Sequence, residues 1–293
     1  MARLASGMGV YYIRDPASSE RRFNRGFRSA ARGRGSGPRP LLDPCIGAHL
    51  RVLIVSDVHA NLEALRAVIA DCERRGGFDQ IWSLGDLIGY GPDPGPCVDL
   101  IRSHEAISVA GNHDLASIGR LSLEAFNEHA AAANRWTSSQ ITAEQAEYLR
   151  GLPLKVEQGL FTMVHGSPRD PIWEYVISVP AAVISFLHFD TECCLVGHSH
   201  VPFLCRPMAE KGAAFVEFPL DTPIGLGGDR MIVNPGGVGQ PRDGDPRASY
   251  AVYDKQGGVI VHHRVEYDVQ ATQAKMEEEG LPQYLIDRLT HGR

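Results

Sequence analysis

The sequence predicts an α/β fold built on two sheets, and two patterns support this prediction. Between residues 51 and 110, three apolar runs typical of buried strands alternate with helical segments. Such a β-α-β-α-β order favours parallel strands joined by right-handed crossovers. After residue 190, further apolar runs follow with few helices between them, which indicates a second, more antiparallel sheet. The 293 residues, 43% of them hydrophobic, suffice for one domain with a sizeable core.

Local signals place the elements in order from residue 50 onward. The first three strands are expected at 51–56, 79–84 and 106–110. The helix after the first strand stops at Gly76-Gly77, and its apolar face is formed by Leu62, Leu65, Val68 and Ile69. Later strands are expected near 154–157, 160–164, 193–196, 213–218, 230–233, 249–254 and 258–265, with helices at 97–103 and 180–188.

Residues 115–151 interrupt this alternation and predict a helical insertion. The segment 123–138 is alanine-rich, and Thr142-Ala143-Glu144-Gln145 has the form of a capping box that opens a second helix. We expect this helical pair to pack over or beside the functional site. The segment 266–293 is predicted to be a helical tail packed on the domain, with Leu285, Ile286 and Leu289 as its docking stripe.

The formal net charge of −6 hides an asymmetry along the chain. Residues 1–40 contain nine arginines but only Asp15 and Glu20 as acids, so this segment carries +7 and the remainder −13. An acidic body argues against long nucleic acids as partners. Residues 1–48 are predicted to be a disordered extension rich in Arg, Gly and Pro. Its origin stays open between a start codon assigned too far upstream, a tail for an anionic partner and an organelle transit peptide.

The six cysteines show no paired spacing that indicates a disulfide framework or a metal site. No apolar run is long enough to span a membrane, and the N-terminal segment lacks the apolar core of a secretory signal. We therefore expect a cytoplasmic protein in a reducing compartment, without a membrane partner.

Five polar clusters share one feature, because each directly follows an apolar strand. Each cluster alone is a weak signal, since a histidine at a strand end is more often a hydrogen-bonded structural residue. Ligands in open α/β sheets gather at the carboxyl ends of strands, so the five clusters together predict one shared site. They are Asp57-Val58-His59, Gly85-Asp86, Gly111-Asn112-His113-Asp114, His165-Gly166 and Gly197-His198-Ser199-His200.

The clusters offer more metal ligands than one ion requires. A catalytic zinc takes about three protein ligands and a water, so seven ligands suit two divalent ions with one bridging carboxylate. Oxygen and imidazole ligands without thiolate favour Mn, with Fe or Zn as alternatives. The seven candidate ligands are Asp57, His59, Asp86, Asn112, His165, His198 and His200.

The order of these motifs, across about residues 51–265, resembles the calcineurin-like metallophosphoesterases. The stretches 85–94 and 234–244 are similar to the small bacterial branch of predicted phosphodiesterases. The resemblance implies a β-sandwich of two mixed sheets flanked by helices. It also implies that one metal is held by Asp57, His59, Asp86 and His200, and the other by Asp86, Asn112, His165 and His198.

The implied activity is metal-dependent hydrolysis of a phosphate ester by a hydroxide that bridges the two ions. His113 is not in the ligand set but adjoins it. We expect His113 to protonate the leaving oxygen and to contact a phosphoryl oxygen, with a purely orienting role as the alternative.

One departure from the family concerns its protein phosphatases, which carry Gly-Asp-x-x-Asp-Arg-Gly. Here Gly89 and Tyr90 replace the second aspartate and the arginine. This difference favours a phosphodiester or a small phosphomonoester as the substrate. The alternatives are a Ser/Thr protein phosphatase and, from another class, a non-catalytic metal-binding regulatory or scaffold protein.

Candidate substrate contacts are Asn61, Tyr90 and Arg242. Asn61 has helix capping as its preferred alternative role. For Arg242 the alternative is a surface ion pair with Asp243 or Asp245. Trp173 and Tyr175 are aromatic candidates for a substrate-facing wall, but core packing is the expectation for both.

Overall fold

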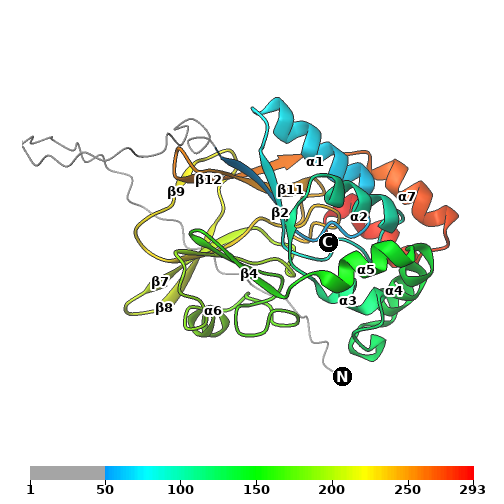
Figure 1. Cartoon of the computed structure of the whole chain (residues 1–293), viewed down its shortest axis with the longest axis horizontal. Helices are drawn as coiled ribbons and strands as arrows, with labels where there is room; N and C mark the ends of the chain where they lie inside the picture. Colours follow the sequence, from blue (N-terminus) through cyan, green and yellow to red (C-terminus); the bar gives the residue numbers. More distant parts are fainter. Residues whose placement is uncertain (1–49) are drawn as a thin grey trace, which may run out of the picture.

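The computed structural model describes residues 50–293, so the predicted N-terminal extension lies outside the described residues. Two six-stranded sheets are flanked by helices, as Figure 1 shows. The first sheet has the order β3-β2-β1-β11-β12-β9 and the second the order β4-β5-β6-β10-β7-β8. Both sheets contain parallel and antiparallel pairs, which confirms the predicted pair of mixed sheets.

The bounds of the strands follow from the backbone pairing. The first sheet contains β1 (Arg51–Val55), β2 (Gln80–Ser83), β3 (Ile107–Ser108), β9 (Ile224–Gly225), β11 (Ala248–Asp254) and β12 (Val259–Val265). The second contains β4 (Lys155–Gln158), β5 (Phe161–Val164), β6 (Cys193–Leu195), β7 (Phe203–Met208), β8 (Gly212–Glu217) and β10 (Met231–Asn234).

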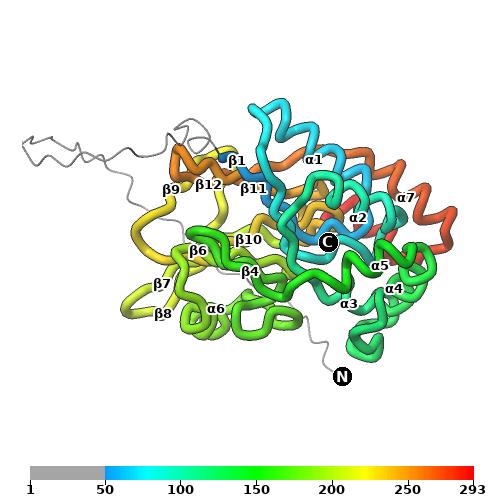
Figure 2. Tube along the Cα trace, in the orientation of Figure 1, coloured from blue at the N-terminus to red at the C-terminus, as the bar shows by residue number. Residues whose placement is uncertain are grey.

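The helices lie on the outer faces of the sheets and at one end of the molecule. They are α1 (Leu62–Arg74), α2 (Pro94–Ser103), α3 (Asn112–Ser117), α4 (Glu128–Gln140), α5 (Ala143–Gly151), α6 (Val179–Ser185), α7 (Val269–Glu278) and α8 (Gln283–Asp287), with short 3-10 helices η1 (Leu123–Ala125) and η2 (Arg288–His291). Figure 2 shows α7 running beside α1 although the two are far apart in the sequence.

The apolar run of β1 explains why this strand occupies the centre of the first sheet. Val52 and Ile54 pack into the core between the two sheets, whereas Leu53 and Val55 pack into the core under α1 and α2. Alternate residues of a strand point to opposite faces, so a continuous apolar run suits a strand that is buried on both faces.

Two expectations about the later strands were wrong. The strands at 249–254 and 258–265 join the first sheet, because β1 pairs with β2 through one edge and with β11 through the other. The strand β7 was not predicted, since Arg206 and Pro207 interrupt its apolar run. Pro207 lies beyond the part of β7 that pairs with β10, so its missing N–H does not break that ladder.

The helical insertion and the C-terminal helices pack together. The predicted capping box of Thr142 and Gln145 is present at the start of α5. The helix α4 begins later than expected, after Asn127, whose side chain accepts from the Ala130 N–H. Its Ala130 and Ala133 share a buried cluster with the predicted docking residues of the tail, Leu285, Ile286 and Leu289.

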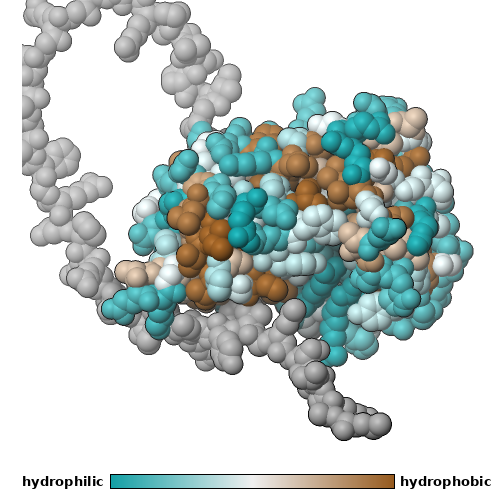
Figure 3. All heavy atoms as spheres, turned by 90° about the horizontal axis from the view of Figure 1, so that it is seen from below, coloured by the Kyte–Doolittle hydropathy of each residue, from teal (hydrophilic) through white to brown (hydrophobic). Residues whose placement is uncertain are grey.

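Some hydrophobic side chains remain at the surface, and the face in Figure 3 shows them between hydrophilic ones. Among them Leu187 is 78% exposed. Within the described residues, no helix is long and apolar enough to cross a membrane. All five cysteines that the structure describes are buried and free, as expected.

The burial of β1 predicts a large stability difference between two leucines. Leu53→Ala should lower the free energy of unfolding by about 2–5 kcal/mol, because it leaves a cavity in a fully buried position. The control Leu187→Ala should change it by less than about 0.5 kcal/mol. Urea titration followed by circular dichroism measures both values, and equal losses would contradict the central position of β1.

Candidate metal centre

The five predicted clusters meet at one end of the two sheets. In the first sheet, Asp57 and His59 follow β1, Asp86 follows β2 and Asn112 follows β3. In the second sheet, His165 follows β5, and His198 and His200 follow β6. All seven candidate ligands and His113 are at most 4% exposed. The structure therefore brings together every residue of the predicted metal site, and it does so across both sheets.

One group of side chains is formed by Asp57, His59 and His200. The Nε2 atoms of the two histidines are 3.2 Å apart, and His200 Nε2 is 3.2 Å from Asp57 Oδ1. Each Nδ1–H donates to a main-chain oxygen, of Ile88 for His59 and of Gln240 for His200. Burial lowers the pKa of both histidines well below the usual value, so both are neutral. Two imidazole lone pairs therefore face each other across 3.2 Å.

A second group is formed by Asn112, His165 and His198. The His165 Nδ1–H donates to the main-chain oxygen of Leu84 at 2.9 Å. Its Nε2 lies 3.0 Å from Asn112 Oδ1 and 3.1 Å from His198 Nδ1. Burial lowers the pKa of His198 to about 2, so this ring is neutral as well. Oxygen and nitrogen atoms again converge on one point.

Asp86 lies between the two groups. Its Oδ2 is 3.7 Å from His59 Nε2 and 3.3 Å from His165 Nε2. Burial opposes ionisation of Asp86, but the imidazoles of His165 and His113 outweigh it and lower the pKa. Burial also opposes ionisation of His165 and by itself would lower the pKa of this ring, but the negative charge of Asp86 raises that pKa to about 9. This centre thus attracts positive charge strongly.

The donor atoms fit divalent cations. Two ligands of one zinc-sized ion lie about 3–3.5 Å apart, which matches most of the separations within each group. Asp57 Oδ1 and His198 Nε2 are buried without a hydrogen-bond partner among the described residues, which is costly without a cation nearby. Histidines whose other nitrogen donates to a carbonyl are typical metal ligands. The residue clusters therefore form a candidate divalent metal site.

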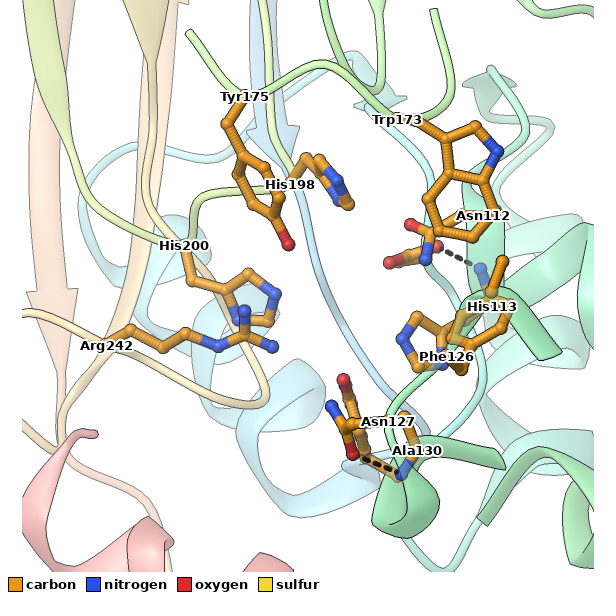
Figure 4. A pocket seen from close by; sticks show the side chains of 13 residues that line it. Asn112, His113, Phe126, Asn127, Ala130, Trp173, Tyr175, His198, His200 and Arg242 are labelled. Carbon is orange, nitrogen blue, oxygen red and sulfur yellow. Dashed lines mark hydrogen bonds between the residues drawn. The ribbon is translucent and has the colours of Figure 1, made fainter. Parts of the chain in front are cut away.

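His113 adjoins the centre outside the two groups described above, and one of its ring nitrogens lies within 4.8 Å of ligand atoms of His59 and Asp86. Its backbone N–H donates to Asp86 Oδ1 at 2.9 Å, and its Nδ1–H donates to Asn134 Oδ1 at 3.1 Å. Burial lowers the pKa of His113 to about 4. With Nδ1 occupied, the Nε2 atom is the one available to a ligand, and His113 faces the pocket from the side opposite Arg242 (Figure 4).

Asn134 is a residue that the sequence did not single out. It lies on α4, is fully buried, and also accepts from the Ser117 hydroxyl at 3.1 Å. An added Cβ at Gly89 would lie 2.6 Å from His113 Nδ1, so the backbone closes the other approach to this nitrogen. A lone asparagine in an alanine-rich helix carries no sequence signal beyond its polarity.

Asp114 holds the loops that carry the ligands. It accepts from the backbone N–H groups of Asp86 at 2.8 Å, Gly111 at 2.9 Å and Ile88 at 3.2 Å. Gly111 is required by space, since a Cβ there would lie 2.0 Å from Asp86 Oδ1. The motif Gly-Asn-His-Asp thus supplies two site residues and the residues that position Asp86.

The loop after β10 holds the ligand loops from the other side. Asn234 Nδ2 donates to the main-chain oxygen of Gly197 at 2.8 Å, and the Gly239 N–H donates to that of Asp57 at 2.9 Å. A Cβ at Gly239 would lie 1.8 Å from the Val58 oxygen. Gly236 has φ +80°, as expected for a strand-ending turn.

A pocket opens over the centre and contains two of the three candidate substrate contacts. Besides site residues, it is lined by Tyr90, Arg242, Trp173, Tyr175 and Phe126 (Figure 4). Tyr175 stacks on the ring of His198 at 3.9 Å and is 42% exposed, so the expectation of core packing was wrong for this residue. Sequence patterns do not distinguish such an aromatic wall from a core.

Two further expectations can be compared with the structure. Asn61 caps α1, accepting from the Ala64 N–H at 3.1 Å, and does not line this pocket. The alternative ion pair of Arg242 is not formed, because Asp243 pairs with Arg264 and Asp245 with Arg247.

Comparison with known proteins identifies the family. The model of the calcineurin-like phosphoesterase superfamily domain matches residues 50–258. The protein MJ0912 of Methanocaldococcus jannaschii is 39% identical over 248 residues, which are 83% of this chain and 98% of that protein. A crystal structure of a metallophosphoesterase from Sphaerobacter thermophilus is 48% identical, with a TM-score of 0.77, and covers 84% of this chain and 100% of its own.

More distant relatives match only part of the chain. A symmetrical bis(5'-nucleosyl)-tetraphosphatase of Aromatoleum aromaticum is 27% identical over 126 residues, which are 40% of this chain and 44% of that protein. The family model covers most of the described residues, and the resemblance predicted from the motifs is thereby confirmed. The chain belongs to the calcineurin-like phosphoesterase superfamily and is a phosphoric ester hydrolase.

Proposed function

We propose that this chain is a dinuclear-metal phosphoesterase that hydrolyses a phosphodiester or a small phosphomonoester. The observation that carries the proposal is the position of Asp86 Oδ2, 3.7 Å from a nitrogen of one ligand group and 3.3 Å from a nitrogen of the other. A single carboxylate oxygen between two sets of lone pairs supports two ions rather than one. The first ion would be held by Asp57, His59, Asp86 and His200, and the second by Asp86, Asn112, His165 and His198.

Two divalent ions bound there would acidify a water and offset negative charge on the phosphoryl oxygens. The protein contributes a rigid frame for this chemistry. Asp86 accepts the His113 N–H through Oδ1 and keeps Oδ2 for the centre, so one carboxylate fixes the ligand groups relative to His113. Burial of the whole set excludes bulk water from the ligand atoms.

In the proposed reaction, an oxygen from water bonds to phosphorus, the bond from phosphorus to the leaving oxygen breaks, and His113 gives that oxygen a proton. Asn134 holds the Nδ1 side of the ring, so Nε2 is the atom that can transfer it. Burial disfavours the protonated ring, and the negative charge of a bound phosphate ester opposes that effect. Asn134 is thus proposed as a positioning residue.

Arg242 and Tyr90 are the proposed substrate contacts, because both line the pocket above the ligand groups. In this chain Tyr90 occupies the position that carries arginine in the protein phosphatases. Arg242, from the loop after β10, supplies a guanidinium to the pocket instead. Gly89 likewise provides no carboxylate beside His113, and Asn134 contacts that nitrogen instead. These differences disfavour the protein-phosphatase alternative. The complete ligand set together with His113 disfavours a non-catalytic scaffold.

Manganese is the metal proposed for the centre, since the ligands are oxygens and imidazoles without thiolate. The cytoplasm is the proposed location. Support comes from the five described cysteines, which are all buried and free, as is usual in a reducing compartment.

Removal of metal should abolish hydrolysis. We expect chelator-treated protein to lose turnover of bis(p-nitrophenyl) phosphate and to regain it with added Mn²⁺. Release of p-nitrophenol measures this rate, and p-nitrophenyl phosphate and a phosphopeptide test the monoester and protein-phosphatase alternatives. Metal bound without turnover of any of the three would favour the scaffold and sink the proposal.

Loss of His113 should affect chemistry and leave the metal centre intact. His113→Ala should lower kcat on glycerol 2-phosphate, whose alkoxide leaving group needs a proton, by about 10²–10⁴-fold, the usual contribution of a general acid. Release of inorganic phosphate measures this rate. Metal content, read by atomic emission, should stay at the wild-type value because His113 is outside both ligand groups. The control is His188→Ala, at an exposed position just after α6, and it should keep full activity.

The same assay tests the positioning role of Asn134. Asn134→Ala should lower kcat more than it raises KM, whereas Asn134→Asp, which keeps an acceptor for the Nδ1–H, should restore much of the rate. Unchanged rates in His113→Ala would remove the acid role, and equal losses in both Asn134 variants would reduce Asn134 to a packing residue.

A further inference from the structure

Two arginines beside the pocket have no aspartate or glutamate partner within the part of the chain that the structure describes. Arg242 Nη2 and Arg288 Nη1 each donate to the same atom, Gln240 Oε1, and both distances are 2.9 Å. The remaining bond of Arg288 goes to the main-chain oxygen of Arg293, and Arg242 Nε is buried without a partner. Two full positive charges thus share one neutral amide oxygen.

The two acidic residues that follow Arg242 closely in the sequence are paired with other arginines. In the same region Arg247 pairs with Asp245 and Arg264 pairs with Asp243, so the nearby carboxylates are already used. Burial, together with the charge of Arg242, lowers the pKa of Arg288 to about 10. Like charges held together at a partly buried site destabilise each other unless an anion lies between them.

The pair is attached to the metal centre through Gln240. The main-chain oxygen of Gln240 accepts the His200 Nδ1–H at 2.6 Å, while its side-chain oxygen holds both arginines. Arg242 points into the pocket in Figure 4, and the red C-terminal helical segment lies beyond it. Arg288 reaches this wall through the Gln240 oxygen that it shares with Arg242, whose guanidinium carbon lies 5.8 Å from the centroid of the Tyr90 ring.

We propose that Arg242 and Arg288 form a second anion subsite, which takes a phosphate adjacent to the one held at the metal centre. This inference rests on the proposed function and narrows its substrate class to organic oligophosphates, in which two or more phosphates are linked. A simple phosphodiester carries one negative charge and has no second phosphate to occupy the arginine pair. An additional phosphate offers the acceptor oxygens that a pair of guanidinium groups binds best.

Arg288 is the informative position, because it lies outside the ligand groups and beyond Arg242. Adenosine 5'-monophosphate and α,β-methylene adenosine 5'-diphosphate are suitable probes, since they differ by one phosphate and the second resists hydrolysis. Calorimetry with the Mn²⁺-loaded protein gives both Kd values directly. We expect wild type to bind the diphosphate analogue about tenfold more tightly than the monophosphate, as one charge-assisted contact provides.

In Arg288→Gln the ratio of the Kd for the monophosphate to the Kd for the diphosphate analogue should fall to about one. Arg288→Lys, which keeps the charge, should retain part of the preference for the diphosphate analogue. The control is Arg120→Gln, since Arg120 is exposed, lies outside the pocket and donates to a main-chain oxygen. It should keep the wild-type ratio. An unchanged ratio in Arg288→Gln, or an equal loss in Arg120→Gln, overturns the subsite.

The subsite and the proposed function fail in different ways. Absence of Mn²⁺-dependent hydrolysis of both bis(p-nitrophenyl) phosphate and p-nitrophenyl phosphate overturns the function, whereas the ratio of the two Kd values still decides whether the arginines bind a second phosphate. Normal hydrolysis with equal affinity of wild type for both nucleotides overturns the subsite alone.

Discussion

The arrangement of lone pairs around Asp86 is the constraint on which the rest of the site depends. Imidazole nitrogens face one another and face carboxylate or amide oxygens at 3.0–3.9 Å, and main-chain carbonyls orient the rings of His59, His165 and His200. Without a cation such an arrangement is unfavourable, because buried lone pairs repel and unpaired oxygens are desolvated. The fold nevertheless holds it, and this explains why so many hydrogen bonds of the surrounding loops are directed at keeping the ligands in place.

The backbone carries strain at the same residues. Five of the candidate ligands have a positive φ, between 48° and 62°, which costs a non-glycine residue about 1–3 kcal/mol. Such conformations persist where the surroundings determine them. Asp114 fixes the loop that carries Asp86 through two N–H groups, and the loop from Asn234 to Gln240 fixes the loops that carry Asp57 and His200. The residues with positive φ are Asp57, His59, Asp86, His198 and His200.

The sequence predicted the centre better than it predicted the pocket, and the difference has a physical origin. A buried strand followed by a polar cluster is a local signal, and the ends of β1, β2, β3, β5 and β6 place these clusters together. Asn134 of the insertion, Tyr175 of the loop between β5 and α6, and Arg288 of the C-terminal segment reach the site through tertiary packing, for which no local pattern exists. The same limit explains the error about β11 and β12. The local sequence does not reveal which strand pairs with β1 on the side away from β2, and in the structure that strand is β11.

The central claim is that two ions share Asp86, and anomalous diffraction from crystals grown with Mn²⁺ tests it most directly. The account predicts two anomalous peaks about 3.5–4 Å apart, with the Asp86 carboxylate between them and one ligand group around each. A single peak, or peaks that do not share Asp86, would contradict it.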